Sequence, residues 1–243
     1  MIYLRSAAFA LLQAVATVIF AILAWLTFPF GPFTRYRVIT LWNRFVVWLA
    51  WRLCGMRYEI RGRENLPRVP AVVLAKHQSA WETIALPVLF PPLAIVAKKE
   101  LLRVPFFGWG LAMLSPIAID RRAGREALKQ ILRQGGERLK QGFGVLVFPE
   151  GTRVKPGEAG RYGIGGAWLA AHTAAAVVPV AHNAGELWPK NAFLKYPGTI
   201  TLSVGPPIAT RGLKPEAVNE AARTWIEAEM ERLPHARAGY ADP

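Results

Sequence analysis

An uncharged apolar segment near the amino terminus constrains the fold of this chain more than any other feature. Residues 7–30, AAFALLQAVATVIFAILAWLTFPF, contain no charged side chain. As one helix they would extend about 36 Å, more than the roughly 30 Å hydrocarbon core of a bilayer. The segment is long for the apolar region of a signal peptide, and no small-x-small cleavage site follows it. A buried core helix of a soluble domain rarely has this length without a charge, so we expect residues 7–30 to attach the chain to a phospholipid membrane.

A second, amphipathic segment follows the helix-breaking sequence Phe30-Gly31-Pro32 and begins near Tyr36. Its arginines fall near one stripe while tryptophan and aliphatic side chains cover the rest, which is typical of a helix lying in the membrane interface. The pair predicts either a span followed by an interfacial helix or a hairpin dipping into one leaflet. The arginines after the first helix are Arg35, Arg37, Arg44, Arg52 and Arg57, whereas only Arg5 precedes it. By the positive-inside tendency we expect the inner (cytoplasmic) membrane, with the rest of the chain on the cytoplasmic side.

Composition narrows the class of protein and of partner. Of the 243 residues, 53% are hydrophobic, a share that is high for a soluble protein and low for a polytopic membrane protein. Lys and Arg number 30 against 16 Asp and Glu, and the formal charge of +14 suits a nucleic acid, a phospholipid surface or a phosphorylated substrate. The single cysteine, Cys54, allows no disulfide within the chain. With four scattered histidines it offers no zinc-ligand spacing, so we expect no structural metal.

From about Met56 onward, short apolar runs alternate with amphipathic segments. The runs are rich in Val, Ile and Leu, like strands covered on both faces. We expect strands at residues 71–75, 93–97, 117–119, 145–148, 177–181 and 200–204, and helices at 81–89, 106–113, 125–140, 167–173 and 215–233. The alternation predicts an α/β domain whose mostly parallel sheet is flanked by helices. We therefore expect a membrane-anchoring helix pair at 1–55, the α/β domain at 56–233 and a disordered tail at 234–243.

Polar side chains follow four of the predicted strands. These strand ends are Lys76-His77, Lys98-Lys99-Glu100, Asp120-Arg121-Arg122 and residues 149–153, PEGTR. In open α/β sheets the ligand crevice lies at the carboxyl ends of the strands. One histidine and several cations at that edge predict a site for an anionic substrate.

The stretch KHQSAWET, residues 76–83, has two interpretations. Ser79 and Glu82 form a capping-box pattern that begins a helix. Alternatively, His77 is a general base steadied by the Glu82 carboxylate. The two are compatible, because a glutamate in the first helical turn directs its side chain back toward the residues before the helix. FPEGTR, residues 148–153, is equally open on its own: Arg153 is either a surface residue after a turn or a bidentate phosphate clamp.

Together the two stretches resemble the motifs of the glycerolipid acyltransferases. HQSAWE resembles the H-x-x-x-x-D motif, with Glu82 one methylene longer than the usual Asp, and FPEGTR is the third motif without departure. IAIDRR, residues 117–122, looks like the second motif, VVPVA, 177–181, like the fourth, and KKELLRVPFFGWG, 98–110, like a stretch of bacterial members. Over residues 56–210 the chain resembles the 1-acylglycerol-3-phosphate acyltransferases, whose bacterial members often carry an N-terminal helix pair. Gly163 replaces the lysine that bacterial members often have, and Arg161 is the candidate to compensate.

The resemblance implies transfer of a fatty acyl group from acyl-CoA or acyl carrier protein (acyl-ACP) to the sn-2 hydroxyl of lysophosphatidic acid, giving phosphatidic acid. His77 would be the general base and Glu82 would orient it. Lys98, Arg121 and Arg153 would hold the phosphate, and Glu150, Gly151 and Thr152 would line the acceptor site. The resemblance implies no cofactor beyond the acyl thioester and no metal. No G-x-S-x-G sequence occurs, so an acyl-enzyme serine is not supported.

Three alternatives remain open. The first is an acyltransferase of the same family that uses glycerol-3-phosphate, a lysophospholipid or an amino-acid lipid as acceptor. The second is a catalytically inactive module that binds membrane surfaces. The third, nucleic-acid binding, rests on charge alone, and no recognisable nucleic-acid motif accompanies the basic residues, so we expect no nucleic-acid partner.

Overall fold

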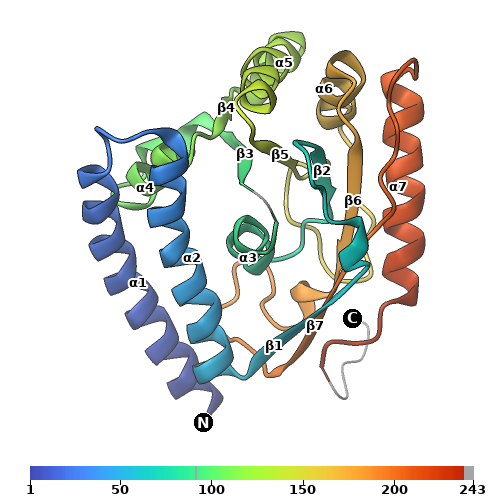
Figure 1. The fold of residues 1–243 in the computed structure, drawn as a ribbon. Helices are drawn as coiled ribbons and strands as arrows, with labels where there is room; N and C mark the ends of the chain where they lie inside the picture. The colour runs from blue at the N-terminus through green and yellow to red at the C-terminus, as the bar shows by residue number, and fades with distance from the viewer. Residues whose placement is uncertain (91, 238–243) are drawn as a thin grey trace.

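A seven-stranded sheet forms the centre of the protein in this computed structural model, which describes residues 1–90 and 92–237 (Figure 1). The strands are β1 (Met56–Arg61), β2 (Val72–Ala75), β3 (Leu93–Lys98), β4 (Ile117–Ile119), β5 (Gly144–Val147), β6 (Val177–His182) and β7 (Gly198–Val204). They lie in the order β1-β7-β6-β2-β5-β3-β4. Neighbouring strands run parallel except for β6 and β7, which are antiparallel, so the predicted α/β fold with a mostly parallel sheet is confirmed.

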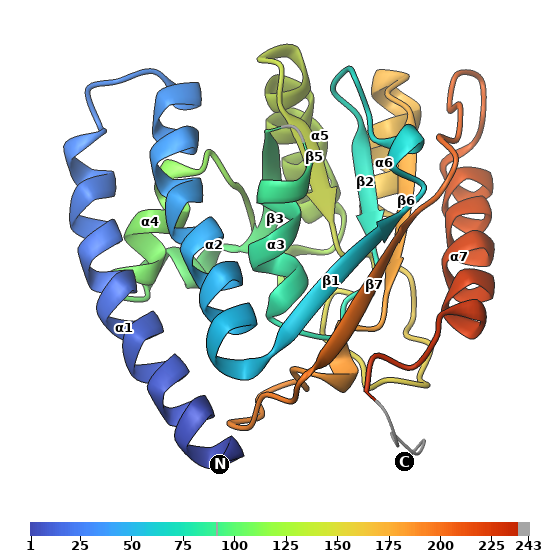
Figure 2. The same cartoon turned by 60° about the horizontal axis from the view of Figure 1, so that its bottom comes forward.

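Helices cover both faces of this sheet (Figures 1 and 2). They are α1 (Ile2–Leu26), α2 (Pro32–Cys54), α3 (Trp81–Leu89), α4 (Phe107–Met113), α5 (Arg125–Lys140), α6 (Gly165–Thr173) and α7 (Pro215–Arg232), with the short 3-10 helices η1 (Arg63–Asn65), η2 (Lys99–Arg103), η3 (Arg121–Ala123) and η4 (Ala184–Glu186). Successive side chains of a strand point to opposite faces. Val72 and Leu74 accordingly pack with residues of α5, α6 and α7, whereas Val73 packs with Leu86 of α3. Burial on both faces explains the unbroken apolar runs in the sequence.

The edge strand β1, MRYEIR, was not among the strands expected from the sequence. It pairs only with β7, and its residues from Arg57 to Glu59 are exposed. An edge strand that pairs on one side and is largely exposed to solvent needs no run of apolar residues. The apolar pattern that predicts buried strands therefore does not detect β1.

The two amino-terminal helices are shifted from the expected positions. The first spans Ile2–Leu26 rather than 7–30, and the second begins at Pro32 rather than near Tyr36. Proline fits the first turn of a helix, where its fixed φ suits the helix and its missing N–H costs no bond, and Gly31 precedes it as the N-cap. Within the described residues, α1 is the one helix long and apolar enough to cross a membrane.

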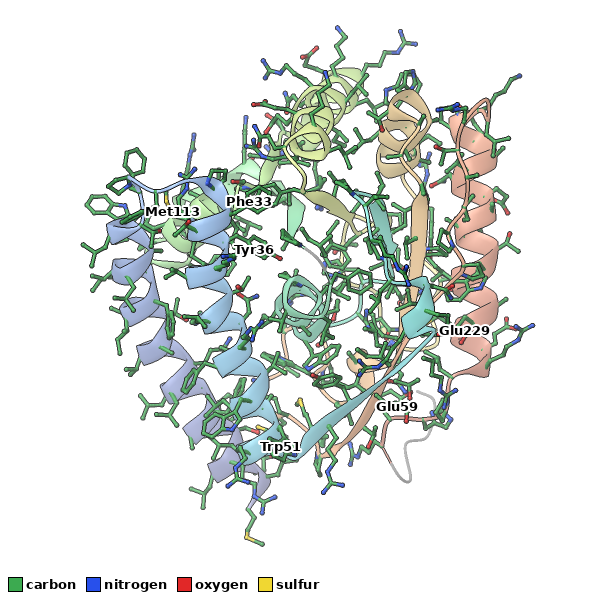
Figure 3. All side chains as sticks on the ribbon, viewed as in Figure 1. Phe33, Tyr36, Trp51, Glu59, Met113 and Glu229 are labelled. Carbon is green, nitrogen blue, oxygen red and sulfur yellow. The ribbon has the colours of Figure 1, made fainter. Side chains whose placement is uncertain are left out.

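The helix pair shares a hydrophobic core with the α/β domain. The hydroxyl of Tyr36 on α2 donates to the Pro87 carbonyl at 2.7 Å and accepts from the Leu93 N–H at 3.1 Å (Figure 3). Burial raises the pKa of this phenol to about 12, so it remains a donor. Phe33 stacks on Phe143 with 4.6 Å between ring centroids. The helix pair before residue 55 and the α/β domain after it are therefore packed together.

Part of the expected disordered tail is ordered. The Ala236 N–H donates to Glu186 Oε2 at 2.7 Å, and the Ala236 carbonyl accepts from the Thr199 N–H at 2.9 Å. These bonds hold the chain after α7 against η4 and the start of β7, up to Arg237. The remainder of the expected tail, 238–243, lies outside the described residues.

Candidate active site

A cavity of about 590 Å³ lies between the carboxyl ends of the strands, α4 and the α1–α2 pair. His77 and three cations, Lys98, Arg121 and Arg153, line it from the ends of β2, β3, β4 and β5. The remaining lining is mostly apolar and comes from α1, α2, α3 and α4, including Phe20, Ile39, Ile84 and Leu111. None of the described residues lining it is a carboxylate, so the charged part of the cavity suits an anion.

The His77 ring is held by the Glu82 carboxylate. His77 Nδ1 lies 2.8 Å from Glu82 Oε1, so the ring donates its Nδ1 proton to the carboxylate. Nε2 then carries a basic lone pair, and no described residue bonds to it. Phe148, the first residue of FPEGTR, stacks on the imidazole at 4.1 Å between centroids and 18° between planes. The carboxylate fixes the tautomer and the phenyl ring fixes the plane, as a general base requires.

Glu82 also closes the start of α3. The same Oε1 accepts from the backbone N–H groups of Gln78 at 3.0 Å and Ser79 at 2.8 Å. Ser79 Oγ accepts from the Trp81 N–H at 3.1 Å, and α3 begins at Trp81. Ala80 rather than Ser79 is the N-cap, so only the Glu82 half of the predicted capping box forms. The same carboxylate makes that contact and the contact to His77.

A second histidine, His182 at the end of β6, lies behind this pair, and sequence reasoning missed it. It is fully buried; its Nε2–H donates to the Lys76 carbonyl at 2.8 Å, and its Nδ1 accepts from the Ala184 N–H at 3.3 Å. Burial lowers the pKa of His182 below its usual value. Burial alone would raise the pKa of Glu82, but the neighbouring imidazoles of His182 and His77 and the Ser79 N–H hold it below its usual value.

The backbone of His77 is fixed by the FPEGTR loop. Its N–H donates to Glu150 Oε2 at 2.8 Å, and its carbonyl accepts from the Val154 N–H at 2.8 Å. Glu150 was expected to line the acceptor site. Its side chain is instead fully buried and does not line the cavity, so it holds the backbone of His77.

A buried ion cluster holds Glu150 in place. Lys76 Nζ lies 2.9 Å from Glu150 Oε1 and 2.9 Å from Glu227 Oε1 on α7. The Tyr162 hydroxyl donates to the same Glu227 oxygen at 2.7 Å. The Lys76 side chain is only 1% exposed, so it needs these partners. Sequence reasoning missed Tyr162 and Glu227, because each looks like an ordinary surface residue until the fold brings them together. Lys76 was expected among the cations that face an anionic substrate, but it is buried, does not line the cavity and pairs with two carboxylates.

The three cations of the cavity have no carboxylate partner among the described residues. Arg153 Nε is buried and unbonded, and Lys98 makes no side-chain hydrogen bond within the described chain. The Arg121 guanidinium donates to the Gly151 carbonyl, and Gly151 turns the chain with φ of +68°. Thr152 is exposed and does not line the cavity, so Gly151 and Thr152 shape the loop that carries Arg153.

The chain is similar in sequence and in fold to known acyltransferases. The sequence profile described as Acyltransferase matches residues 57–183. The chain is 46% identical over 235 residues to the 1-acyl-sn-glycerol-3-phosphate acyltransferase of Pseudomonas aeruginosa, covering 95% of this chain and 91% of that protein. It is 29% identical over 210 residues to a chloroplastic 1-acyl-sn-glycerol-3-phosphate acyltransferase of Arabidopsis thaliana, covering 83% of this chain and 56% of that protein. Its fold is similar to the crystal structure of the 1-acyl-sn-glycerophosphate (LPA) acyltransferase PlsC from Thermotoga maritima, with a TM-score of 0.77, 24% identity and 94% of each chain covered.

Proposed function

Since the chain belongs to the acyltransferase family, we propose that it transfers a fatty acyl group from an acyl thioester to the sn-2 hydroxyl of lysophosphatidic acid, giving phosphatidic acid. One observation carries the proposal. His77, with Nδ1 bound to Glu82 and Nε2 free, lies in a cavity whose charged lining residues are all cations. A hydroxyl needs a base to become a good nucleophile, and an acceptor with a phosphate needs cations beside that base.

The reaction follows from the tautomer of His77. Nε2 takes the proton of the acceptor hydroxyl as its oxygen attacks the thioester carbonyl, and Glu82 stabilises the imidazolium that forms. When the tetrahedral intermediate collapses, the carbon–sulfur bond breaks and the imidazolium returns the proton to the leaving thiolate. A thioester is already an activated acyl donor, so the proposed reaction requires no further cofactor and no metal.

The acceptor and the acyl chain occupy different parts of the cavity. We propose that Arg153, Arg121 and Lys98 bind the phosphate, since a guanidinium forms paired, charge-assisted bonds to phosphate oxygens. The apolar walls from α1, α2 and α4 suit an acyl chain, since each buried methylene contributes about 0.8 kcal/mol.

We also propose attachment to the cytoplasmic face of the inner membrane. Exposed apolar side chains run along α1, including Leu11, Ile19 and Leu26, and α2 exposes Trp48 and Trp51 beside arginines. The Arg52 guanidinium lies over the Trp51 ring, 5.3 Å from its centroid. Tryptophan beside cations favours the membrane interface, and the arginines that follow α1 favour the cytoplasmic side.

An acylation assay tests this function. The purified full-length protein is given lysophosphatidic acid with acyl-CoA or with acyl carrier protein as donor, and glycerol-3-phosphate replaces the acceptor in a parallel reaction. We expect phosphatidic acid to form with at least one donor. A His77→Ala protein is the control and should lose about 10²–10⁴-fold in rate while keeping its fold. Turnover of glycerol-3-phosphate but not of lysophosphatidic acid would assign the other acceptor.

A further inference from the structure

Besides the α1–α2 pair, the segment between β3 and β4 also exposes apolar side chains to solvent. Residues 99–113, comprising η2 and α4, are called the lip here. Within the described residues after Cys54, eight large apolar side chains are exposed, and four of them belong to the lip: Leu101, Val104, Phe107 and Trp109. Each is between 39% and 43% exposed. Leu101 and Phe107 also line the cavity, whereas Val104 and Trp109 are exposed without lining it. Exposed apolar side chains gathered in this way mark contact surfaces.

The lip is continuous with the exposed apolar face of α1. The Trp109 ring lies 6.2 Å from the Trp25 ring near the end of α1, where Trp25, Leu26 and Phe28 are all more than 65% exposed. Figure 3 shows Met113 of α4 beside the ends of α1 and α2 that are joined by their connecting loop. A surface that contacts the exposed face of α1 would therefore contact the lip as well.

Cations lie at the end of the lip that joins the sheet. Lys98, just before the lip, and Lys99 and Arg103 within it are exposed beside its apolar side chains, together with one acidic residue, Glu100. Lys99 pairs with Asp120 at 2.5 Å, whereas Lys98 and Arg103 have no ion-pair partner in the described part of the chain. Apolar side chains next to unpaired cations match the chemistry of an anionic leaflet, whose acyl chains and phosphates lie within a few ångströms of one another. This charge favours a lipid surface over a second copy of the chain, which carries the same excess of positive charge.

The inner side of the lip is a wall of the catalytic cavity. Leu101, Phe106, Phe107 and Leu111 line the cavity that contains His77. The same short segment thus exposes Val104 and Trp109 on the outer surface and contributes an apolar wall to the cavity. We propose that the lip inserts into the membrane interface as a third contact besides α1 and α2. This insertion does not depend on the proposed acyl transfer.

Fluorescent labelling tests insertion without any activity measurement. Cys54 is 1% exposed, so a thiol-reactive, polarity-sensitive dye should label an introduced surface cysteine selectively. Val104→Cys places the dye on the lip. Val69→Cys is the matched control, because Val69 is an exposed valine in the loop before β2, at the opposite end of the parallel strands. The vesicles contain phosphatidylcholine and phosphatidylglycerol, with or without brominated acyl chains.

We expect the dye at position 104 to shift to the blue and to be quenched by brominated chains, while the dye at 69 does neither. A water-like spectrum at 104 in protein that sediments with the vesicles would overturn insertion. A blue shift at 104 without vesicles would assign the lip to a protein contact instead. Protein that fails to sediment at all would overturn both the lip and the membrane attachment.

Discussion

Replacing Glu82 by glutamine separates the electrostatic role of this side chain from its structural one. Oε1 accepts from His77 Nδ1 and from the backbone N–H groups of Gln78 and Ser79. A glutamine oxygen can occupy the same place, and the two backbone donors require an oxygen there rather than an NH2 group. The amide is therefore held in the orientation that preserves the Nδ1–H tautomer of His77. Glu82→Gln removes the charge and leaves the hydrogen bonds.

The expected loss follows from that charge. Two unit charges about 4 Å apart interact by about 4 kcal/mol at an effective dielectric constant of 20. The amide dipole retains part of this, so the imidazolium should lose about 3 kcal/mol of stabilisation. Since about 1.4 kcal/mol corresponds to a factor of ten, kcat should fall on the order of a hundredfold. Stability should change by less than about 1 kcal/mol, because the other carboxylate oxygen is buried without a hydrogen bond and glutamine relieves the buried charge.

The assay measures kcat and the two KM values by varying each substrate while the other is saturating, together with thermal unfolding in detergent. Ser79→Ala is the matched control: it removes the bond to the Trp81 N–H, should cost about 1 kcal/mol of stability and should leave most of the rate. Glu82→Asp should retain substantial activity. A Glu82→Gln protein with normal kcat and normal unfolding would refute the reasoning and reduce Glu82 to a residue that closes α3.

Three other outcomes are expected. Arg153→Ala should raise KM for lysophosphatidic acid tenfold or more, since charge-assisted bonds contribute about 1.5–3 kcal/mol, while Thr152→Ala in the same loop should change it little; steady-state kinetics decide. Lys76→Met should lower the free energy of unfolding by about 3 kcal/mol or more, measured by denaturant unfolding, because it leaves two carboxylates without their buried cation. His182 has a folded pKa below its usual 6.5, so only the unfolded chain is protonated there as the pH falls below 6.5. Stability should then decrease by up to about 1.4 kcal/mol per pH unit, and His182→Asn should lack this slope.

Sequence periodicity predicted the buried part of the fold well because burial on both faces leaves an unbroken apolar run. The strands expected at 117–119 and 177–181 and the helix expected at 125–140 lie within one residue of β4, β6 and α5. The solvent-exposed edge strand β1 contains no unbroken apolar run and was not predicted. The observed start of α2 differs from the expected one because proline is favoured in the first turn of a helix, and α2 begins at Pro32.

The residues that line the cavity could be predicted because they follow strands, and the carboxyl ends of parallel strands meet at one edge. His77, Lys98, Arg121 and Arg153 all do so. The residues that hold them could not be predicted in this way. Glu227 lies 151 positions after Lys76, and its position on α7 gives no sign that it faces a buried lysine. Long-range pairs of this kind become visible only when the packing of α7 against the sheet is known.

The packing of α1 and α2 against the α/β domain gives the amino-terminal segment a structural role besides anchoring. Helix α1 supplies Phe20 to the wall of the cavity, and α2 supplies Ile39. The Asn43 amide donates to the Ile84 carbonyl of α3, the helix whose first turn carries Glu82. A segment that served only as a membrane anchor would need neither a place in the cavity wall nor a hydrogen bond to α3. Because α1, α2 and His77 line one cavity, the proposed attachment to the bilayer and the proposed orientation of the acyl chain toward His77 depend on the same packing. Truncation at residue 55 should therefore remove both.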